Sequence, residues 1–533
     1  MRAAGHADRP RTVAATFIAA ALLTTTACAG GDTDGNGNGP TGDGSRAGTR
    51  PPRAGGTLTM LATGEANSLD PFGASYGGAP ADNARMAALY DPLVYLDPES
   101  DTVKPHLAEA LTTTDGTTWT LRLRRGVAFS DGTPFDADAV RTNWEMHARP
   151  DVRSQHRVAA LGLTLRVVDP LTLGITLAAP NPTFDRTVAV DLTFIAAPSV
   201  LAKGPDVYRN QPIGAGPFTL ARWTRGAEQI YRKNPAYWQK DQGLPHLDQV
   251  NVKVVGDIEQ QYNTLSSGGA DIVIGAEALL DRAKHGLHSR PVRANGGQAV
   301  QFNLTRAPFD DVRARRALAL AIDPAEMART LDLGVVPARG YFNTGSPFFD
   351  PGAAQPAPDR VEAQRLFDEL AAQGRPTDFT FVVPKASVTD KIAQYLQSRL
   401  RAYRNVSMRI EPLDITAYIT RVAVNRNYQA TLYQDWVIDP EPRAWNAFVS
   451  TSPQNLIGWK NPDADRALAA GRAATDPAAR KAAYTDLQRT LAADLPMWVY
   501  AESTQGPVFT DRVAGVELFN AGSVLMDRLG LAP

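Results

Sequence analysis

Aromatic and charged side chains alternate closely in one stretch of the sequence, LYQDWVIDPEPRAWNAF, at residues 432–448. Aromatic rings offer a large contact area at low rotamer cost, and a carboxylate withdrawn from water needs a cation beside it. This mixture predicts the wall of a cavity that excludes water around a bound ligand. The side chains concerned are Tyr433, Asp435, Trp436, Asp439, Glu441, Arg443 and Trp445.

Two common sequence signals of enzymatic chemistry are missing. The chain contains no His-Glu-x-x-His pair, and its single cysteine, Cys28, precedes the globular body. His285 and His288 are three residues apart, but two imidazoles without a third ligand are a weak metal signal, and a solvated polar face explains them better. The sequence therefore predicts binding without catalysis, and it predicts no cofactor and no metal.

The charge balance excludes one class of partner. Lys and Arg total 55 against 56 Asp and Glu, so the chain has no net basic field that would attract nucleic acid. The region from Thr57 to Pro533 is long enough for two or more lobes with separate cores. We therefore expect a monomeric protein that binds through a shaped site and not through bulk charge.

The first residues have the composition of a secretory leader. Three arginines precede an apolar run from Val13 to Leu23, which is shorter than the ~20 residues needed to span a bilayer. The residues Thr25 to Cys28 resemble a bacterial lipobox, although the position that usually carries leucine is a threonine. We expect a signal peptide at 1–27 and a lipid on Cys28, which would hold the protein on the outer face of the cell membrane. Ordinary cleavage after an Ala-x-Ala-like site is the alternative.

A glycine-rich segment follows Cys28. Ten of the residues between Ala29 and Gly56 are glycine and almost none is apolar, so this segment cannot bury enough surface to offset the entropy of ordering. The sequence therefore predicts a disordered tether over 28–56, between the lipid and the body.

The body alternates strand and helix patterns. Residues 55–63 and 117–127 show the period-two alternation of strands, the second with Trp119, Leu121 and Leu123 on one face. Asp476 followed by Pro477 predicts a capped helix start, and another helix follows the aspartates near residue 311. Mixed strands and helices over this length indicate α/β lobes.

Six blocks are distributed in order along the body. They lie at 89–140 (LYDPLVYLDPESDTVKPHLAEAL and onward), 212–218 (PIGAGPF), 232–238 (RKNPAYW), 261–272 (QYNTLSSGGADI), 301–323 (QFNLTRAPFDDVRARRALALAID) and 458–465 (GWKNPDAD). Each block alone has a plain structural explanation, such as a turn or a helix cap. Together, and in this order, they resemble family 5 of the extracellular solute-binding proteins, which serve peptide, nickel and oligosaccharide ABC importers.

This resemblance implies an α/β, two-lobed fold of the periplasmic-binding-protein type, with a hinge and an extra subdomain in the first lobe. We place lobe I at 57–298, lobe II at 299–501 and a return to lobe I at 502–533. The hinge strands would then lie near 299–304 and 497–501, which are apolar and strand-like.

The resemblance also implies a ligand anchor. Peptide-binding members of the family receive the ligand's α-ammonium on an aspartate a few residues after a tryptophan, and Trp436 and Asp439 match that spacing. The Pro-Glu-Pro that follows is shorter than the family's usual motif, so Asp435 is the alternative anchor. A helix cap or a loop position is the structural alternative for Asp439.

Further binding candidates surround this anchor. Arg443 could pair with a ligand carboxylate, with a surface ion pair as the alternative. The candidates for lining side-chain pockets are Tyr433, Trp436 and Trp445, those from the first lobe are Tyr76 and Glu65, and those at the hinge are Phe302 and Asn303.

The function implied is capture without chemistry. A peptide would be enclosed between the lobes, and the closed form would deliver it to an ABC permease powered by a separate ATPase. An oligosaccharide or a nickel chelate as ligand remains open, as do a peptide-sensing lipoprotein and a hydrolase built on the same scaffold.

Overall fold

The computed structural model describes residues 51–533 except 77–78, 276, 281, 285 and 333. The predicted signal peptide, Cys28 and most of the predicted tether lie outside the described residues, and so does His285. None of the described helices is both long and apolar enough to cross a bilayer.

Aspartate caps start several of the longer helices. Asp476 accepts a hydrogen bond from the Ala479 amide at 2.8 Å, and Pro477 lies in the first turn of that helix. Asp311 caps the helix that begins at Val312, so both predicted helix starts are confirmed. These carboxylates satisfy amides that a helix start leaves without partners. The longer helices are α1 (Pro80–Tyr90), α2 (Ala137–Ala148), α7 (Ile258–Ser266), α9 (Val312–Ala321), α10 (Pro324–Leu331), α11 (Arg360–Ala372), α12 (Ser387–Leu400), α15 (Pro462–Ala473) and α16 (Pro477–Asp494). The shorter ones are α3 (Arg157–Ala160), α4 (Phe184–Thr187), α5 (Pro198–Leu201), α6 (Pro205–Tyr208), α8 (Glu277–Leu280), α13 (Ile415–Ile419) and α14 (Arg443–Phe448).

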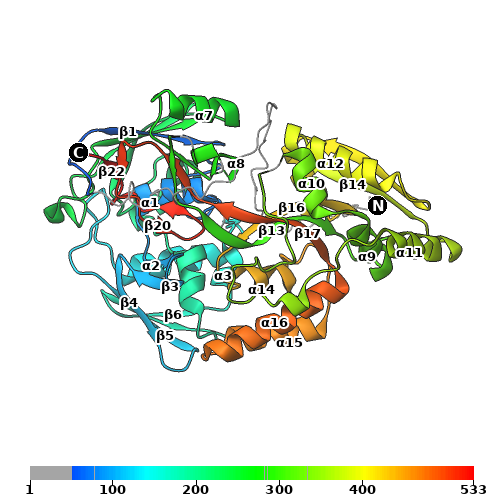
Figure 1. Ribbon diagram of the computed structural model, residues 1–533. Helices are drawn as coiled ribbons and strands as arrows, with labels where there is room; N and C mark the ends of the chain where they lie inside the picture. The colour runs from blue at the N-terminus through cyan, green and yellow to red at the C-terminus, as the bar shows by residue number, and fades with distance from the viewer. Residues whose placement is uncertain (1–50, 77–78, 276, 281, 285, 333) are drawn as a thin grey trace, which may run out of the picture.

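The first lobe is built on a mixed seven-stranded sheet, at the left of Figure 1. Strand β1 pairs in parallel with its two neighbours, β10 and β11, while the pairs farther out in the sheet are antiparallel. The order is β12 (His288–Ser289), β18 (Pro507–Phe509), β11 (Ile272–Ile274), β1 (Thr57–Ala62), β10 (Gln249–Val254), β9 (Glu228–Lys233) and β8 (Phe218–Thr224).

An additional four-stranded antiparallel sheet packs below it, at the lower left of Figure 1. Trp119, Leu121 and Leu123 are buried on one face of β5, as their alternation predicted. The order is β4 (Ala108–Thr113), β5 (Thr118–Leu123), β7 (Thr172–Thr176) and β6 (Thr164–Asp169). Three short two-stranded ribbons complete the lobe: β2 (Val94–Asp97) with β3 (Thr102–Pro105), β19 (Val513–Ala514) with β22 (Gly530–Leu531), and β20 (Leu518–Phe519) with β21 (Ser523–Val524).

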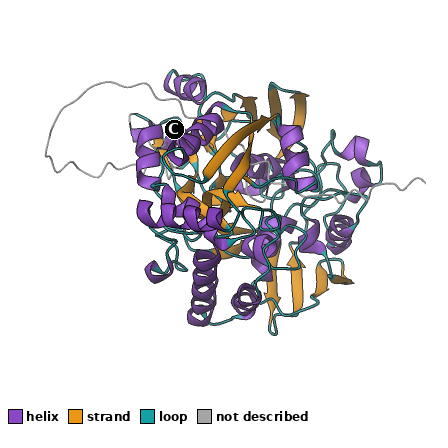
Figure 2. Ribbon diagram, turned by 90° about the vertical axis from the view of Figure 1, so that its right-hand side faces the viewer, coloured by secondary structure: helices purple, strands orange, loops and turns teal. Residues whose placement is uncertain are grey.

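The second lobe has a five-stranded sheet with helices packed outside it, as Figure 2 shows from the side of this lobe. Strands β14 and β15 run parallel, and the long strands β13 and β17 pair antiparallel at the other side. The order is β15 (Val406–Leu413), β14 (Thr377–Pro384), β16 (Ala430–Val437), β13 (Val292–Phe302) and β17 (Met497–Gln505).

Two chain crossings connect the lobes. The chain leaves the first sheet at β12 and enters the second at β13, and it returns from β17 to β18 through Gly506. In Figure 1, β13 and β17 run across the middle of the molecule. The register of this pair shifts near Gly297, which has a φ of 68° and where a Cβ would lie 2.4 Å from the Ala501 carbonyl oxygen. Only glycine allows this approach. The predicted borders of the lobes, at 298 and 502, stay predictions.

Each lobe has its own apolar core. Trp144 and Tyr231 are buried in the first lobe, and Trp498 and Phe381 are buried in the second. A further cluster around Tyr484 lies beneath α15 and α16. Separate cores on either side of two crossing strands define a two-lobed α/β fold, as the resemblance predicted.

Candidate functional site

A cavity of about 350 Å³ lies between the two lobes. The first lobe contributes the segment after β1 and the start of α1. The second contributes β16, residues 384–386 and α13. The polar and charged side chains that line it are Thr63, Glu65, Asn67, Ser75, Asp82, Arg85, Gln301, Lys385, Tyr418, Thr431, Tyr433 and Gln434. Glu65 and Tyr433, both predicted to bind the ligand, therefore line an interlobe cavity, and their role in binding stays a prediction.

The first-lobe wall of the cavity is preorganised by hydrogen bonds. Glu65 accepts from the indole N–H of Trp223 and from the Gly226 amide, each at 2.9 Å. Arg85 donates to Asp82 at 2.6 Å and to the Gly64 carbonyl at 2.7 Å. Because these groups are already paired, they hold their positions before a ligand arrives.

Asp439, the predicted anchor, is surrounded by arginines. Arg480 of α16 binds both of its carboxylate oxygens, at 2.6 and 2.7 Å, and Arg186 of α4 lies 3.0 Å away. Arg186 belongs to the first lobe, so this ion pair joins the two lobes. The Glu441 amide also donates to Asp439 at 2.9 Å. A ligand ammonium would have to displace one of these groups, and the anchoring role of Asp439 stays a prediction.

Asp435, the alternative anchor, is buried with weaker compensation. Its carboxylate accepts from the Trp436 amide at 3.0 Å and from the Tyr433 hydroxyl at 3.2 Å, and it lies 3.5 Å from the guanidinium of Arg443. Burial raises the pKa of Asp435 above its ordinary value, and the charge of Arg443 offsets only part of that rise. The carboxylate therefore retains capacity for another cation.

The two remaining candidates of the stretch lie in α14. Arg443 pairs with Asp435 and not with an exposed acid, so the surface ion pair considered above is not what the structure shows. The guanidinium of Arg472 lies over the ring of Trp445, with its central carbon 3.5 Å from the ring centroid. Arg472 in turn pairs with Glu441 at 2.7 Å. Aromatic and charged groups thus pack together in this stretch. Of the side chains named for it, Tyr433 is the one that lines the interlobe cavity, and the role of the others in ligand binding stays a prediction.

Several buried polar atoms beside β13 have no hydrogen-bond partner in the described part of the chain. They belong to β16, to β17 and to the segment after residue 340, all adjacent to the first half of β13. Such atoms cost ~1–3 kcal/mol each if nothing binds them, so a bound ligand is one explanation for a group of them. They are Trp436 Nε1, Tyr341 OH, Glu502 Oε2, Ser503 Oγ and Gln505 Oε1.

The other predicted residues lie in packed surroundings. Tyr76 is fully buried, stacks on His156 with ring centroids 3.9 Å apart, and donates its hydroxyl hydrogen to the Asp191 carbonyl. Phe302 lies in the core of the second lobe. Asn303 donates to two backbone carbonyls at 3.0 Å. These contacts explain the three residues structurally, and their contact with a ligand stays a prediction.

Sequence reasoning missed Arg186, Arg480 and the unpartnered groups of β17. Both arginines are distant from residue 439 in the chain, and no motif marks them. The signal that could have found Ser503 and Gln505 is a run of polar residues, ESTQ, that ends an otherwise apolar strand.

Comparisons with known proteins agree with this geometry. The chain is 28% identical over 455 residues to the glutathione-binding protein GsiB of Salmonella typhimurium, which covers 81% of this chain and 86% of that protein. It is 27% identical to GsiB of Pectobacterium atrosepticum, over 72% of this chain and 77% of that one.

Solved structures share the fold. The oligopeptide-binding protein AppA from Bacillus subtilis, in complex with a nonapeptide, superimposes with a TM-score of 0.78 at 20% identity, over 90% of this chain and all of that one. The murein tripeptide binding protein MppA of Escherichia coli gives 0.76 at 21% identity, over 91% and 100%. The family model of the bacterial extracellular solute-binding proteins, family 5, matches residues 102–455, more than half of the chain, and the chain therefore belongs to this family of ABC-importer binding proteins.

Proposed function

We propose that the protein captures extracellular peptides between its two lobes and delivers them to the permease of an ABC importer, held at the membrane by a lipid on Cys28. One observation carries the proposal: the cavity between the lobes is lined by polar groups from both. A site divided in this way binds tightly only when the lobes close. Closure would then be the signal that a permease reads.

Peptides suit the groups that lie beside β13. A peptide backbone alternates donors and acceptors, and the unpartnered groups there include a donor, Trp436 Nε1, and an acceptor, Gln505 Oε1. Ser503 Oγ and Tyr341 OH can serve as either. Hydrogen bonds directed at the backbone do not depend on side-chain identity, so we expect several peptide sequences to bind. The relatives described above include proteins named for glutathione and for oligopeptides.

We propose Asp435 as the group that receives the ligand's ammonium. Asp439 has both oxygens bound by Arg480, whereas Asp435 has one guanidinium at 3.5 Å. A buried carboxylate with one distant cation gains more from an added ammonium than one that is already saturated. Asp439 instead joins the lobes through Arg186.

The test begins with what the protein carries. The full chain, purified from cells without denaturation, is analysed by native mass spectrometry, and released molecules are identified. Adducts spread over a range of peptide masses are the expected result. A single sugar or metal chelate would overturn the peptide assignment while leaving the transport role intact.

The membrane anchor needs a separate test. Metabolic labelling with a fatty acid should mark the protein, and Cys28→Ser should abolish the label and release the protein from the cell surface. An unlabelled native protein would contradict the anchor without touching the ligand assignment.

A further inference from the structure

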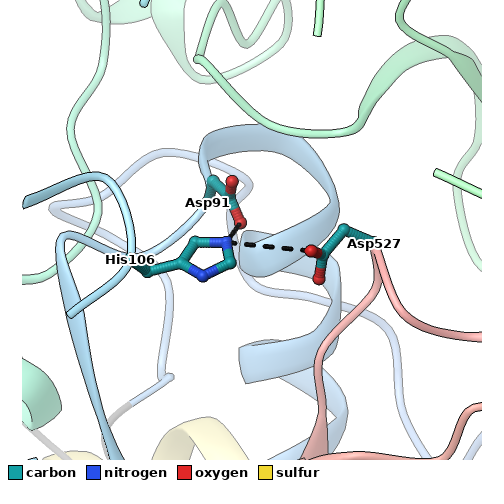
Figure 3. A group of neighbouring side chains, drawn as sticks. All are labelled: Asp91, His106 and Asp527. Atoms are coloured by element: carbon teal, nitrogen blue, oxygen red, sulfur yellow. Dashed lines mark ion pairs between the residues drawn. The ribbon is translucent and has the colours of Figure 1, made fainter. Parts of the chain in front are cut away.

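A second buried group of ionisable side chains lies in the first lobe, among residues distinct from those that line the interlobe cavity. Asp91 follows the end of α1, His106 lies between β3 and β4, and Asp527 lies between β21 and β22, near the end of the chain. All three side chains are at least nine-tenths buried. Figure 3 shows both carboxylates turned toward the same ring nitrogen of His106.

The three side chains lie close enough together to approach one ion. One ligand atom from each residue lies within 4.8 Å of the others. His106 Nε2 is 2.9 Å from Asp91 Oδ1 and 4.0 Å from Asp527 Oδ2. Ligand atoms about 2.1 Å from a zinc ion are at most about 4.2 Å apart, so both separations fit.

Hydrogen bonds explain only part of the arrangement. His106 Nε2 forms an ion pair with Asp91 Oδ1, at 2.9 Å. Neither oxygen of Asp527 accepts a hydrogen bond in the described part of the chain, although the residue is fully buried. A buried carboxylate that accepts no hydrogen bond and points toward an imidazole is the observation that indicates a missing ligand.

The positive charge nearby compensates only part of this group. Arg528 Nε lies 3.1 Å from Asp527 Oδ2 and forms an ion pair with that carboxylate. Two carboxylates with one arginine leave one negative charge, which is balanced only when His106 carries a proton or a cation binds in its place.

Neighbouring side chains fix the orientation of the Asp91 carboxylate through hydrogen bonds. Its second oxygen, Oδ2, accepts from the Tyr237 hydroxyl at 2.8 Å and from the Trp238 indole N–H at 3.0 Å. Its backbone has a φ of 58°, which costs free energy in a residue other than glycine. Hydrogen-bonded, oriented carboxylates are typical of metal sites.

We propose that Asp91, His106 and Asp527 bind a Zn²⁺ ion. His106 Nε2, Asp91 Oδ1 and the two oxygens of Asp527 would supply four donor atoms. The imidazole and carboxylate set favours a first-row transition ion, whereas Ca²⁺ and Mg²⁺ prefer oxygen ligands alone. The ion would fasten the C-terminal segment to the body of the first lobe. The proposal is independent of the peptide assignment.

The first test uses the full chain without an affinity tag, treated with EDTA and dialysed. Calorimetric titration with Zn²⁺ should show one site per chain, and the melting temperature should rise with free Zn²⁺. Ca²⁺ and Mg²⁺ at the same concentrations should leave it unchanged. Failure to bind Zn²⁺, or equal stabilisation by Ca²⁺, would overturn the proposal.

Two variants locate the ion. Asp527→Asn should weaken Zn²⁺ binding at least about tenfold, because it removes a charged ligand. Asp511→Asn is the matched control, since Asp511 is exposed and pairs with His288 at the surface. Zn²⁺ affinity that is unchanged in Asp527→Asn, or lost in Asp511→Asn, would contradict this placement.

X-ray absorption of the unmutated zinc-loaded protein keeps the test decisive if Asp527→Asn fails to fold. The spectrum should fit nitrogen and oxygen ligands with one imidazole and no sulfur. Two imidazoles, or a sulfur from the single cysteine, would place the ion elsewhere and overturn the proposal.

Discussion

Asp435 and Asp439 are four residues apart, both buried, and differently surrounded. Asp439 has bidentate contact with Arg480 and a second arginine, Arg186, from the other lobe. Asp435 has one guanidinium at 3.5 Å, a tyrosine hydroxyl and the Trp436 amide. The comparison shows that a buried acid near the lobe boundary is not by itself a ligand anchor. What matters is how much of its charge the chain already balances.

Local backbone structure causes the difference. Asp435 lies within β16, opposite Gly297 of β13, and a Cβ on the neighbouring Gly296 would come within 2.8 Å of the Asp435 Cβ. Asp439 follows the end of that strand, where the chain turns toward α16 and α4. Asp435 is therefore held against a glycine of β13, and Asp439 faces two helices that carry arginines.

The largest effect is expected on stability, from Arg480→Met. This change leaves the buried carboxylate of Asp439 with Arg186 alone, and breaking a buried pair costs about 3 kcal/mol. Urea unfolding would show the loss of unfolding free energy. Arg489→Met in the same helix is the control, because Arg489 forms an exposed pair and should change stability by less than about 0.5 kcal/mol. Equal effects from both variants would refute the distinction.

A smaller effect is expected from Arg186→Gln, which removes the interlobe contact with Asp439. Closure should then be less favourable, and peptide Kd should rise about fivefold, equivalent to about 1 kcal/mol. Calorimetry gives the affinity, and small-angle scattering gives the change in shape on binding. Asp101→Asn serves as the control, because it removes a first-lobe partner of Arg186 and leaves the interlobe pair in place. If the control weakened binding as much, the interlobe pair would not be the cause.

The smallest effect is a pH dependence of stability. The pKa of Asp435 is raised in the folded protein, mainly by burial, so its stabilising contribution is present at low pH and lost as pH rises through the folded pKa. The groups facing it are Tyr433, Tyr341 and Arg443. The unmutated protein should therefore lose stability relative to Asp435→Asn as pH rises above the ordinary pKa of an aspartate, measured by urea unfolding. A relative gain over that range would show that Arg443 outweighs burial.

The sequence predicted individual strands and helices because the signals for them are local. Alternation marked β5, and the pair Asp476 and Pro477 marked the start of α16. The family blocks supplied the two-lobed arrangement, which no local pattern contains.

The site was harder to predict, because its balance of charge is set by residues that are distant in the chain. Spacing after Trp436 indicated Asp439, but nothing near it indicated that Arg186 and Arg480 would lie against it. Likewise, His106 and Asp527 are far apart in the chain, so no metal-ligand spacing in the sequence could reveal them.

The most direct measurement combines acid variants with a modified ligand. A tripeptide and its N-acetylated form are titrated into the unmutated protein, Asp435→Asn and Asp439→Asn, and each affinity ratio is compared. We predict that the unmutated protein prefers the free ammonium about tenfold, that Asp435→Asn loses this preference, and that Asp439→Asn keeps it. A preference lost in Asp439→Asn and kept in Asp435→Asn would contradict the assignment of Asp435 as the anchor.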